Sequence, residues 1–229
     1  MKISVIIPVY NEESTIAEVI RKVLLVDINK EIIVVDDGST DNTSEIVDDL
    51  KKRNVELTTV HHSMVNLGKG LAIRIGLKYT KGDVVIIQDA DLELDPQEYY
   101  QLVEPIRKDE ADVVFGSRFL RKNPNIPFRS RFANFFLTGF ANLLYGLRIT
   151  DEATAYKVFK TDVIKSINLQ CRGFEFCPEV VAKLAKRGTR IAEVPIGFNP
   201  RGKTEGKKLH YFRDGLKAIW TLVKHKFVD

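Results

Sequence analysis

The stretch Val84-Val85-Ile86-Ile87-Gln88-Asp89-Ala90-Asp91-Leu92 joins a short apolar run to two closely spaced carboxylates. Four consecutive β-branched residues predict a buried strand. Asp89 and Asp91 follow it two positions apart, which keeps them on one side of an extended chain. Carboxylate oxygens suit Mg²⁺ or Mn²⁺, cations that are commonly shared with substrate phosphates. Because Asp is also common in turns, this interpretation depends on partners elsewhere in the chain.

Apolar strands and amphipathic helices alternate through the first half of the chain. Continuous Val/Ile strands between helices indicate an α/β fold, with a mostly parallel central sheet covered by helices on both faces. Ligands of such sheets bind beyond the carboxyl ends of the strands, which brings the loops 10–12, 36–38 and 89–91 together. The expected strands are 3–9, 31–35, 57–61 and 84–87, and the expected helices are 13–25, 40–52 and 69–79.

The pattern changes after a further expected strand at 112–116. Residues 128–147 predict an amphipathic helix or a pair of helices, and the side chains expected on one side are Phe132, Phe135, Phe136, Phe140, Leu143 and Leu144. The elements expected after it are a strand at 155–159, a helix at 178–187, a strand at 190–195, a basic loop at 199–208 and a helix at 211–227. Without repeats or a Gly-, Ser- or Pro-rich linker, we expect a single domain, 1–229, with halves 1–115 and 116–229.

Charge is distributed unevenly along the 229 residues, whose net charge is only +4. Six basic and no acidic residues lie between Ser117 and Thr150, and twelve basic and four acidic residues lie between Lys183 and Asp229. Two such tracts predict a face that meets phosphates or an anionic surface. No recognisable nucleic-acid-binding module accompanies them, so nucleic acid is not an expected partner.

Cysteine usage and hydropathy bear on location. Cys171 and Cys177 have the spacing of neither a redox motif nor a zinc site, and free thiols fit a reducing cytoplasm. The apolar run 3–7 ends at a proline and two glutamates follow, which is unlike a signal peptide. The longest charge-free stretch, 132–147, is shorter than the ~20 residues that cross a bilayer. We therefore expect a cytoplasmic protein that does not span a membrane.

The loops at the predicted carboxyl edge carry a distinctive chemistry. The segment Pro8-Val-Tyr-Asn-Glu stands where dinucleotide folds carry a glycine-rich loop, so it presents a ring, an amide and a carboxylate to a base. Asp36 and Asp37 suit ribose hydroxyls or a base edge. The diphosphate would then be held by a cation on Asp89 and Asp91. This arrangement predicts a transferase that uses a sugar nucleotide.

Motifs along nearly the whole chain resemble family 2 glycosyltransferases of the GT-A fold. The segments that carry this resemblance are 9–12 (Val-Tyr-Asn-Glu), 35–41 (Val-Asp-Asp-Gly-Ser-Thr-Asp), 66–70 (Asn-Leu-Gly-Lys-Gly) and 89–92 (Asp-Ala-Asp-Leu), in the family's order. Further on, segments 116–118, 129–136, 174–176, 193–196 and 200–208 look like the dolichol-phosphate mannose synthase branch.

The resemblance implies a metal-dependent, inverting transfer from a nucleoside diphosphate sugar such as GDP-mannose or UDP-glucose. Residues 1–115 would bind the nucleotide sugar and residues 116–229 the acceptor. Asp91 would bind the metal and Asp89 the metal or the ribose. Glu93 would be an additional ligand, although a glutamine is usual there in the mannose synthases. The candidate substrate-binding residues are Pro8, Tyr10, Asn11, Glu12, Asp36, Asp37, Lys69, Asp89, Ala90, Ser117, Arg131 and Glu175.

The acceptor class can be argued from proton chemistry. A sugar hydroxyl needs a general base, whereas a phosphate monoester with a second pKa of ~6 is already largely a dianion at pH 7. An enzyme acting on a lipid phosphate should therefore present cations, which also offset charge on the departing diphosphate. The candidate catalytic residues are Asp91, Arg118, Arg201 and Lys207, with Arg131 as a further cation. Glu175 stays open between a base and a sugar-hydroxyl ligand.

The expected acceptor is polyprenyl or dolichyl phosphate. Polysaccharide-forming relatives carry Gln-x-x-Arg-Trp near the acceptor, and the segment 170–174 (Gln-Cys-Arg-Gly-Phe) does not match it. The alternatives are transfer to a sugar hydroxyl or glycolipid, a nucleotidyltransferase, for which a Gly-rich loop is lacking, and a non-catalytic binding subunit.

The amphipathic segment 128–147 has two interpretations. It packs as core, or it lies in a membrane interface with its arginines near head groups, and both can hold if the segment covers the sheet on one side. The second favours a protein held peripherally on the cytoplasmic face of a membrane, where a membrane-anchoring protein is a potential partner.

Overall fold

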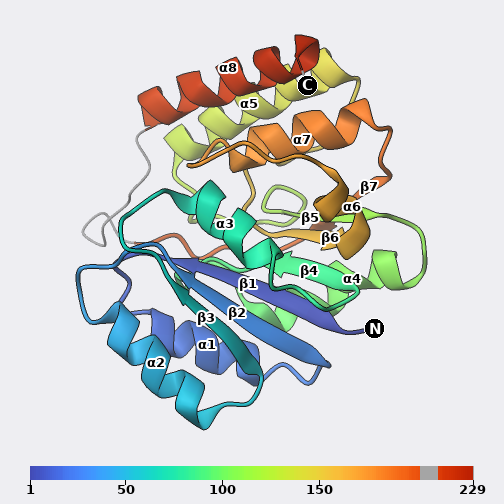
Figure 1. Cartoon of the computed structure of the whole chain (residues 1–229). Helices are drawn as coiled ribbons and strands as arrows, with labels where there is room; N and C mark the ends of the chain where they lie inside the picture. Colours follow the sequence, from blue (N-terminus) through green and yellow to red (C-terminus); the bar gives the residue numbers. More distant parts are fainter. Residues whose placement is uncertain (202–210, 229) are drawn as a thin grey trace.

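A mixed sheet with helices on both faces forms the centre of the protein (Figure 1). This computed structural model describes residues 1–201 and 211–228. Within that part, seven strands are ordered β3-β2-β1-β4-β6-β5-β7. Their bounds are β1 (Ile3–Val9), β2 (Lys30–Asp36), β3 (Leu57–His62), β4 (Val84–Ile87), β5 (Val113–Ser117), β6 (Lys157–Lys160) and β7 (Ile191–Pro195).

The sheet is mostly parallel, as the sequence predicted. β1 pairs in parallel with β2 on one side and β4 on the other, and only β6, among the described strands, runs antiparallel to its neighbours β4 and β5. Every residue of β1, β2 and β4 is buried, as expected for strands covered on both faces. Because β1, β2 and β4 run the same way, their carboxyl ends lie at one edge.

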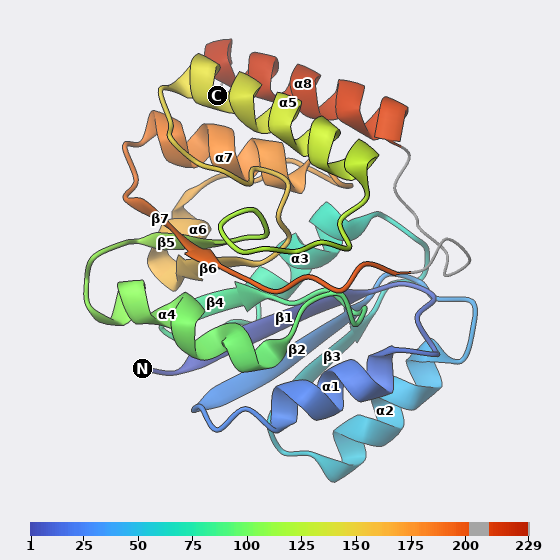
Figure 2. The same cartoon turned by 180° about the vertical axis from the view of Figure 1, so that it is seen from behind.

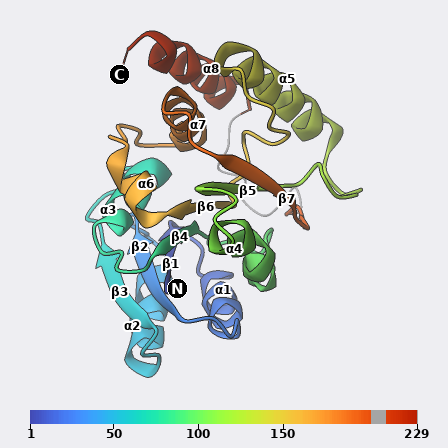
Figure 3. The same ribbon diagram turned by 90° about the vertical axis from the view of Figure 1, so that its right-hand side faces the viewer.

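Two hydrophobic clusters, one on each face of the sheet, form the core. One cluster packs α1 and α4 against the sheet, and the other packs α3, α6 and α7, with α5 and α8 beyond them. Figure 2 shows the side covered by α1, α2 and α4, and Figure 3 shows α5, α7 and α8 gathered at the end away from α1 and α2. The helix bounds are α1 (Ile16–Leu24), α2 (Thr43–Arg53), α3 (Lys69–Leu77), α4 (Tyr99–Arg107), α5 (Phe128–Tyr145), α6 (Thr161–Ser166), α7 (Phe176–Lys186) and α8 (Tyr211–Phe227).

The helix α4 and the short α6 were not predicted. Yet α4 has a recognisable start, because the Asp95 carboxylate accepts the N–H of Gln97 and Pro96 opens a 3₁₀ turn (Pro96–Glu98). Segment 128–147 forms one helix rather than a pair, and it ends at Gly146, whose φ of 69° is left-handed.

Two features bear on the expectations about cysteines and hydropathy. Cys171 and Cys177 are both free thiols. Over residues 1–201 and 211–228, no helix combines the length and apolar character needed to cross a membrane.

Candidate active site

A pocket of about 370 Å³ opens where β1, β2 and β4 end. Parallel strands that end at one edge bring their following loops together, and the three loops singled out in the sequence meet here. The sequence-derived candidates that line it are Pro8, Tyr10, Glu12, Asp37, Lys69, Asp89, Ala90, Asp91 and Arg201.

Two cations pair with the carboxylates of this pocket. Lys69, the first residue of α3, forms an ion pair with Asp89. Arg201 forms an ion pair with Asp91 and another with Glu12, where Nη1 lies 2.9 Å from Oε1. Burial and the neighbouring Asp89 raise the pKa of Asp91 to about 6, and Arg201 acts in the opposite direction. The pocket thus concentrates carboxylates together with the cations that compensate them.

Asp37 positions the loop that precedes α3. Its carboxylate accepts the N–H of Leu67 at 2.9 Å and that of Gly68 at 2.7 Å. Gly68 has a φ of 99°, and a Cβ there would collide with the carbonyl oxygen of Arg172. Burial raises the pKa of Asp37, and the two N–H bonds act against that rise. Asp37 therefore lines the pocket and also fixes the backbone of the loop that precedes α3.

Asp36 and Asn11 lie outside the pocket lining and connect its loops. The Asp36 carboxylate accepts hydrogen bonds from the Ser39 N–H at 3.0 Å and the Ser44 hydroxyl, and it contacts His62 Nδ1 at 3.0 Å. Burial favours a higher pKa for Asp36, but these hydrogen bonds together lower it. The N–H of Asn11, a residue with a φ of 47°, donates to the Ser39 hydroxyl at 2.9 Å. Both candidates thus tie the loop after β1 to the loop after β2.

The carboxylate oxygens of this pocket suit a divalent cation whose coordination is completed by a bound ligand. Mg²⁺ is commonly held by one or two carboxylates together with substrate phosphates, and Asp89 and Asp91 line the same pocket. In the described part of the chain, no three His, Cys, Asp or Glu side chains are grouped to hold a metal ion. Glu93 does not line the pocket, and its carboxylate accepts the backbone N–H of Arg201 at 2.9 Å. Asp89 and Asp91 therefore fit a cation shared with a bound diphosphate rather than an all-protein cage.

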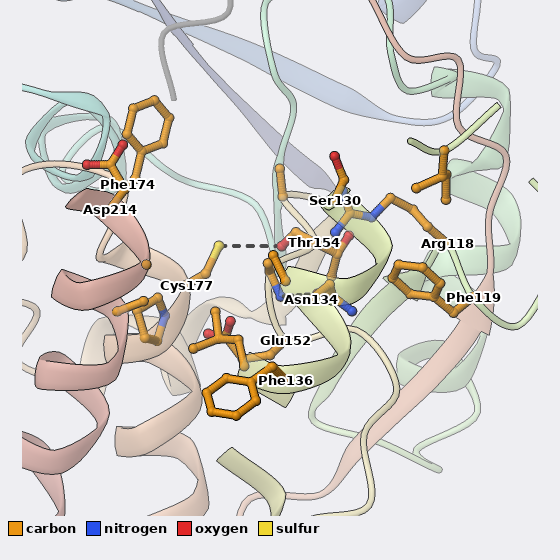
Figure 4. Close-up of a pocket in the computed structure, with 18 of the residues that line it drawn as sticks. Arg118, Phe119, Ser130, Asn134, Phe136, Glu152, Thr154, Phe174, Cys177 and Asp214 are labelled. Carbon is orange, nitrogen blue, oxygen red and sulfur yellow. Dashed lines mark hydrogen bonds between the residues drawn. The ribbon is translucent and has the colours of Figure 1, made fainter. Parts of the chain in front are cut away.

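A second cavity, of about 500 Å³, adjoins this pocket. Lys69, Asp89 and Phe174 line both spaces, so the two meet at these three residues. Most of the second cavity's lining is apolar or aromatic and comes from α5, α7, α8 and the loops beside them. Figure 4 shows Phe119, Phe136 and Phe174 around this space.

A small polar group lies among these apolar side chains. Figure 4 shows Asn134, Glu152, Thr154 and Cys177 among the residues that line the cavity, and Cys177 Sγ lies 3.5 Å from the Thr154 carbonyl oxygen. Glu152 is fully buried, and neither of its carboxylate oxygens has a hydrogen-bond partner among the described residues. Burial raises the pKa of Glu152 to about 7. Glu152 and Asn134 were not predicted from the sequence, because no motif spacing marks residues that only tertiary packing brings together.

Arg118 and Ser117 lie beside the second cavity. Arg118 lines it and donates from Nε and Nη2 to the two carboxylate oxygens of Asp151, each at 2.7 Å. The Ser117 and Thr150 hydroxyls form a hydrogen bond at 2.6 Å. Two of the Arg118 donor groups are therefore engaged within the protein.

The remaining candidates are more scattered. Arg131 is exposed and donates to the Asn123 carbonyl oxygen at 3.3 Å. Glu175 accepts the N–H groups of Arg172 and Gly173 at 3.1 and 3.0 Å and lines neither space. Hydrogen bonds to these groups outweigh burial and lower its pKa. Lys207 lies outside the described residues.

A protein-family model matches most of the chain. The family model described as glycosyl transferase family 2 matches residues 4–167. This range contains the loops after β1, β2 and β4, and it extends through β6.

Several curated proteins are similar to the chain. The dolichol-phosphate mannosyltransferase of Pyrococcus furiosus is 31% identical over 98% of this chain and 64% of its own length. The undecaprenyl-phosphate mannosyltransferase of Micrococcus luteus is 30% identical over 96% of each. The UDP-N-acetylglucosamine–dolichyl-phosphate N-acetylglucosaminyltransferase of Methanococcus voltae is 33% identical, covering 85% of this chain and 84% of that protein.

Solved structures support the fold. Glucosyl-3-phosphoglycerate synthase from Mycobacterium tuberculosis, in complex with Mn²⁺, UDP and phosphoglyceric acid, superposes with a TM-score of 0.74. It is 23% identical and covers all of this chain and 79% of its own. At this identity the likeness establishes the GT-A architecture alone.

Proposed function

From the premise that the chain belongs to glycosyl transferase family 2 and is a hexosyltransferase, we propose that its acceptor is polyprenyl or dolichyl phosphate. The donor is a nucleoside diphosphate sugar of the GDP-mannose or UDP-glucose type, and the transfer is metal-dependent and inverts the anomeric centre. The three curated relatives described above all carry a lipid phosphate in their names.

The observation that carries this proposal is the meeting of the two spaces. The first pocket is lined by carboxylates and cations suited to a nucleotide diphosphate, and the second is mainly apolar. They join at Lys69, Asp89 and Phe174. A hexose on a diphosphate in the first pocket would thus face a space suited to an apolar molecule with a charged head.

In the proposed reaction, an oxygen of the acceptor phosphate forms a bond to the anomeric carbon. The bond from that carbon to the diphosphate oxygen breaks, and the diphosphate leaves with the electron pair. No general base is needed, because the acceptor phosphate is already ionised near neutral pH. Acceptor and leaving group lie on opposite sides of the sugar, which gives inversion.

Charged residues of this chain would contact the diphosphate of the donor. Asp89 and Asp91 would hold a divalent cation, which supplies charge stabilisation for the departing diphosphate when it is bound. Lys69 and Arg201 place permanent positive charge at the same pocket. Such preorganised charge counts most where charge develops in the transition state. Residues 1–115 would accordingly serve mainly the donor and residues 116–229 mainly the acceptor.

One observation favours a second candidate, transfer to a sugar hydroxyl or a glycolipid. Glu152 is a buried carboxyl beside the second cavity, and its pKa of about 7 is suited to a general base. A hydroxyl acceptor would need such a base, whereas a phosphate acceptor would not. Retention of lipid-phosphate transfer in Glu152→Gln would therefore favour the phosphate acceptor.

A lipid phosphate acceptor also implies where the enzyme works, because such an acceptor is held in a membrane. We propose that the chain works peripherally on the cytoplasmic face of a membrane, where a membrane-anchoring protein would be its partner. The basic residues between Ser117 and Thr150 support contact with an anionic surface.

The proposal is tested by nucleoside diphosphate release with Mn²⁺, from GDP-mannose and UDP-glucose in parallel. Each donor is assayed with and without a short polyprenyl phosphate, and with free polyprenol as the matched acceptor lacking the phosphate. Release that requires the lipid phosphate supports the proposal and identifies the donor. Release that is as fast with free polyprenol as with polyprenyl phosphate would overturn it.

A further inference from the structure

Glu152 carries a buried carboxyl group that the fold leaves without a partner. The residue is fully buried, and it is the only one in the described part of the chain whose two carboxylate oxygens are both buried and unpaired. A buried polar group without a hydrogen bond costs stability. Its presence in a cavity therefore points to a role in binding a ligand.

Hydrogen bonds fix the main chain on both sides of this carboxyl. The N–H of Glu152 donates to the Thr138 hydroxyl at 3.0 Å, and its carbonyl oxygen accepts from Lys157 Nζ at 2.8 Å. The next N–H, that of Ala153, donates to Asn134 Oδ1 at 3.3 Å. Helix α5 and strand β6 thus set the position of Glu152 and leave its carboxyl group available.

Lys157 is a buried cation close to Glu152, yet its ammonium group does not pair with the carboxylate. Its Nζ donates to the carbonyl oxygens of Glu152 and Thr154 and lies 4.5 Å from the ring centre of Phe115. Burial raises the pKa of Glu152 to about 7, although the positive charge of Lys157 acts in the opposite direction. Near neutral pH the carboxyl is thus partly protonated, and it can donate as well as accept a hydrogen bond.

Glu152 lines the second cavity close to the place where this cavity meets the first pocket. The Cys177 thiol, which lines the same cavity (Figure 4), is within electrostatic reach of Glu152. The same thiol is within electrostatic reach of Lys69 and Asp89, two of the residues at which the spaces join. Glu152 is therefore near the junction at which the proposed transfer would occur.

The hexose is the part of the proposed substrates that suits an unpaired carboxyl group. A polyprenyl chain offers no hydrogen-bonding groups. The acceptor phosphate and the donor diphosphate are anions, and a carboxylate repels both. Hexose hydroxyls are uncharged and can donate and accept hydrogen bonds, which matches a carboxyl in an apolar cavity.

We propose that Glu152 binds a hydroxyl group of the hexose carried by the donor and thereby helps to select the sugar. The inference rests on the proposed function, which makes the donor a nucleoside diphosphate sugar, and it goes further by assigning a specificity residue that no sequence motif contains. It gives Glu152 a binding role in place of the general base that a hydroxyl acceptor would need. A site that hydrogen-bonds a substrate hydroxyl discriminates strongly, because a sugar lacking that hydroxyl leaves the buried group unpaired.

Calorimetric titration in Mn²⁺, without any acceptor, isolates the contribution of the sugar. UDP and UDP-glucose are compared, as are GDP and GDP-mannose, and the ratio of the two Kd values in each pair reports on the hexose alone. For the donor that the parent binds, Glu152→Met should weaken binding of the nucleotide sugar at least about tenfold and leave that of the diphosphate unchanged. Glu152→Gln keeps a hydrogen-bonding group and should retain most of the affinity.

Stability provides a second measurement. Because Glu152→Met removes an unpaired buried carboxyl and keeps an unbranched side chain, its thermal midpoint should be at least that of the parent. Glu152→Ala removes the same group and replaces Glu152→Met if the longer side chain does not fit. Glu110→Met, at an exposed position between α4 and β5, is the matched control and should bind both members of each pair as the parent does.

Each alternative role of Glu152 gives a different result. An unchanged ratio of Kd values in both Glu152→Met and Glu152→Ala would overturn the proposal. An unchanged ratio with turnover lost in Glu152→Gln would assign a general base instead, and an unchanged ratio with a raised KM for polyprenyl phosphate would assign an acceptor contact. The titrations contain no acceptor, so failure of the proposed function appears only in the release assay and is distinguishable from failure of this inference.

Discussion

Arg118 holds Asp151 through two parallel hydrogen bonds of 2.7 Å, and the Asp151 side chain is fully buried. The Arg118 guanidinium also lies 5.8 and 5.2 Å from the ring centres of Phe119 and Phe198. Its fork is thus fixed between a carboxylate and two rings at the edge of the second cavity. Arg118 can present positive charge to that cavity, but not its full set of donors.

Asp151→Asn should destabilise the fold by about 3–5 kcal/mol, because one partner of a buried ion pair loses its charge. Urea denaturation would measure the change. Arg121→Ala is the control, since its 3.5 Å contact with Glu98 is exposed and its loss should cost no more than about 0.5 kcal/mol. Equal midpoints for the two variants would show that the Arg118–Asp151 pair adds nothing to stability.

Gly68→Ala should destabilise the loop that closes the first pocket. The φ of 99° and the close approach of the Arg172 carbonyl both disfavour a Cβ, with an expected cost of about 1–3 kcal/mol. Nucleotide affinity should fall as well, because Asp37 binds the N–H of this residue. Thermal unfolding and calorimetric titration with a nucleoside diphosphate measure the two effects.

Gly139→Ala provides the matched substitution. Gly139 lies within α5, and a Cβ there meets nothing within 4 Å, so a stability gain of up to about 1 kcal/mol is expected. If Gly68→Ala were as stable as Gly139→Ala, the backbone at position 68 could relax, and Asp37 would not depend on it.

The convergence of the three loops was predictable because it follows from strand direction alone. Runs of Val and Ile between helices predict parallel strands, and parallel strands place their following loops at one edge. The role of each side chain within a loop was not predictable in this way. Asp36 and Asp37 are adjacent carboxylates, yet one binds Ser39 and Ser44 and the other faces the pocket. Side chains of neighbouring residues diverge, and the sequence alone does not show which of them faces the ligand.

The sequence likewise did not predict which elements pack against one another. The spacing of the aromatic residues in 128–147 shows that they share a side of a helix, but it does not show whether another element covers that side. Glu152 carried no signal either, since its environment depends on Thr138 of α5, whose hydroxyl accepts its N–H at 3.0 Å.

Asp91→Asn should remove metal-dependent nucleotide binding. With one of the two carboxylates proposed to bind the metal neutral, the affinity for a nucleoside diphosphate in Mn²⁺ should fall at least about tenfold. Calorimetric titration measures it, and chelation of the metal from the parent protein should give a similar loss. Unchanged Mn²⁺-dependent affinity in Asp91→Asn would show that Asp91 is not a metal ligand.

Glu93→Gln tests whether the third sequence-derived ligand takes part. Because its carboxylate does not line the pocket and accepts the Arg201 N–H, we expect Mn²⁺-dependent affinity close to that of the parent. Asp49→Asn, on the exposed surface of α2, shows the effect of removing an acidic charge elsewhere. A loss in Glu93→Gln as large as that in Asp91→Asn would make Glu93 a ligand after all.

Arg201→Ala should impair turnover more than donor affinity. The guanidinium contacts Asp91 and Glu12 in the pocket, where a departing diphosphate would gain charge during transfer. A cation that acts mainly on this developing charge lowers the barrier without tightening substrate binding, so a loss of about 10²–10³-fold in kcat is expected with little change in KM. Arg201→Lys should recover part of the rate, because it keeps the charge but not the fork. Steady-state release of nucleoside diphosphate measures both constants, with Arg121→Ala as the control for loss of an exposed arginine. Parental kcat in Arg201→Ala would return this residue to a structural role, that of joining Glu12 to Asp91.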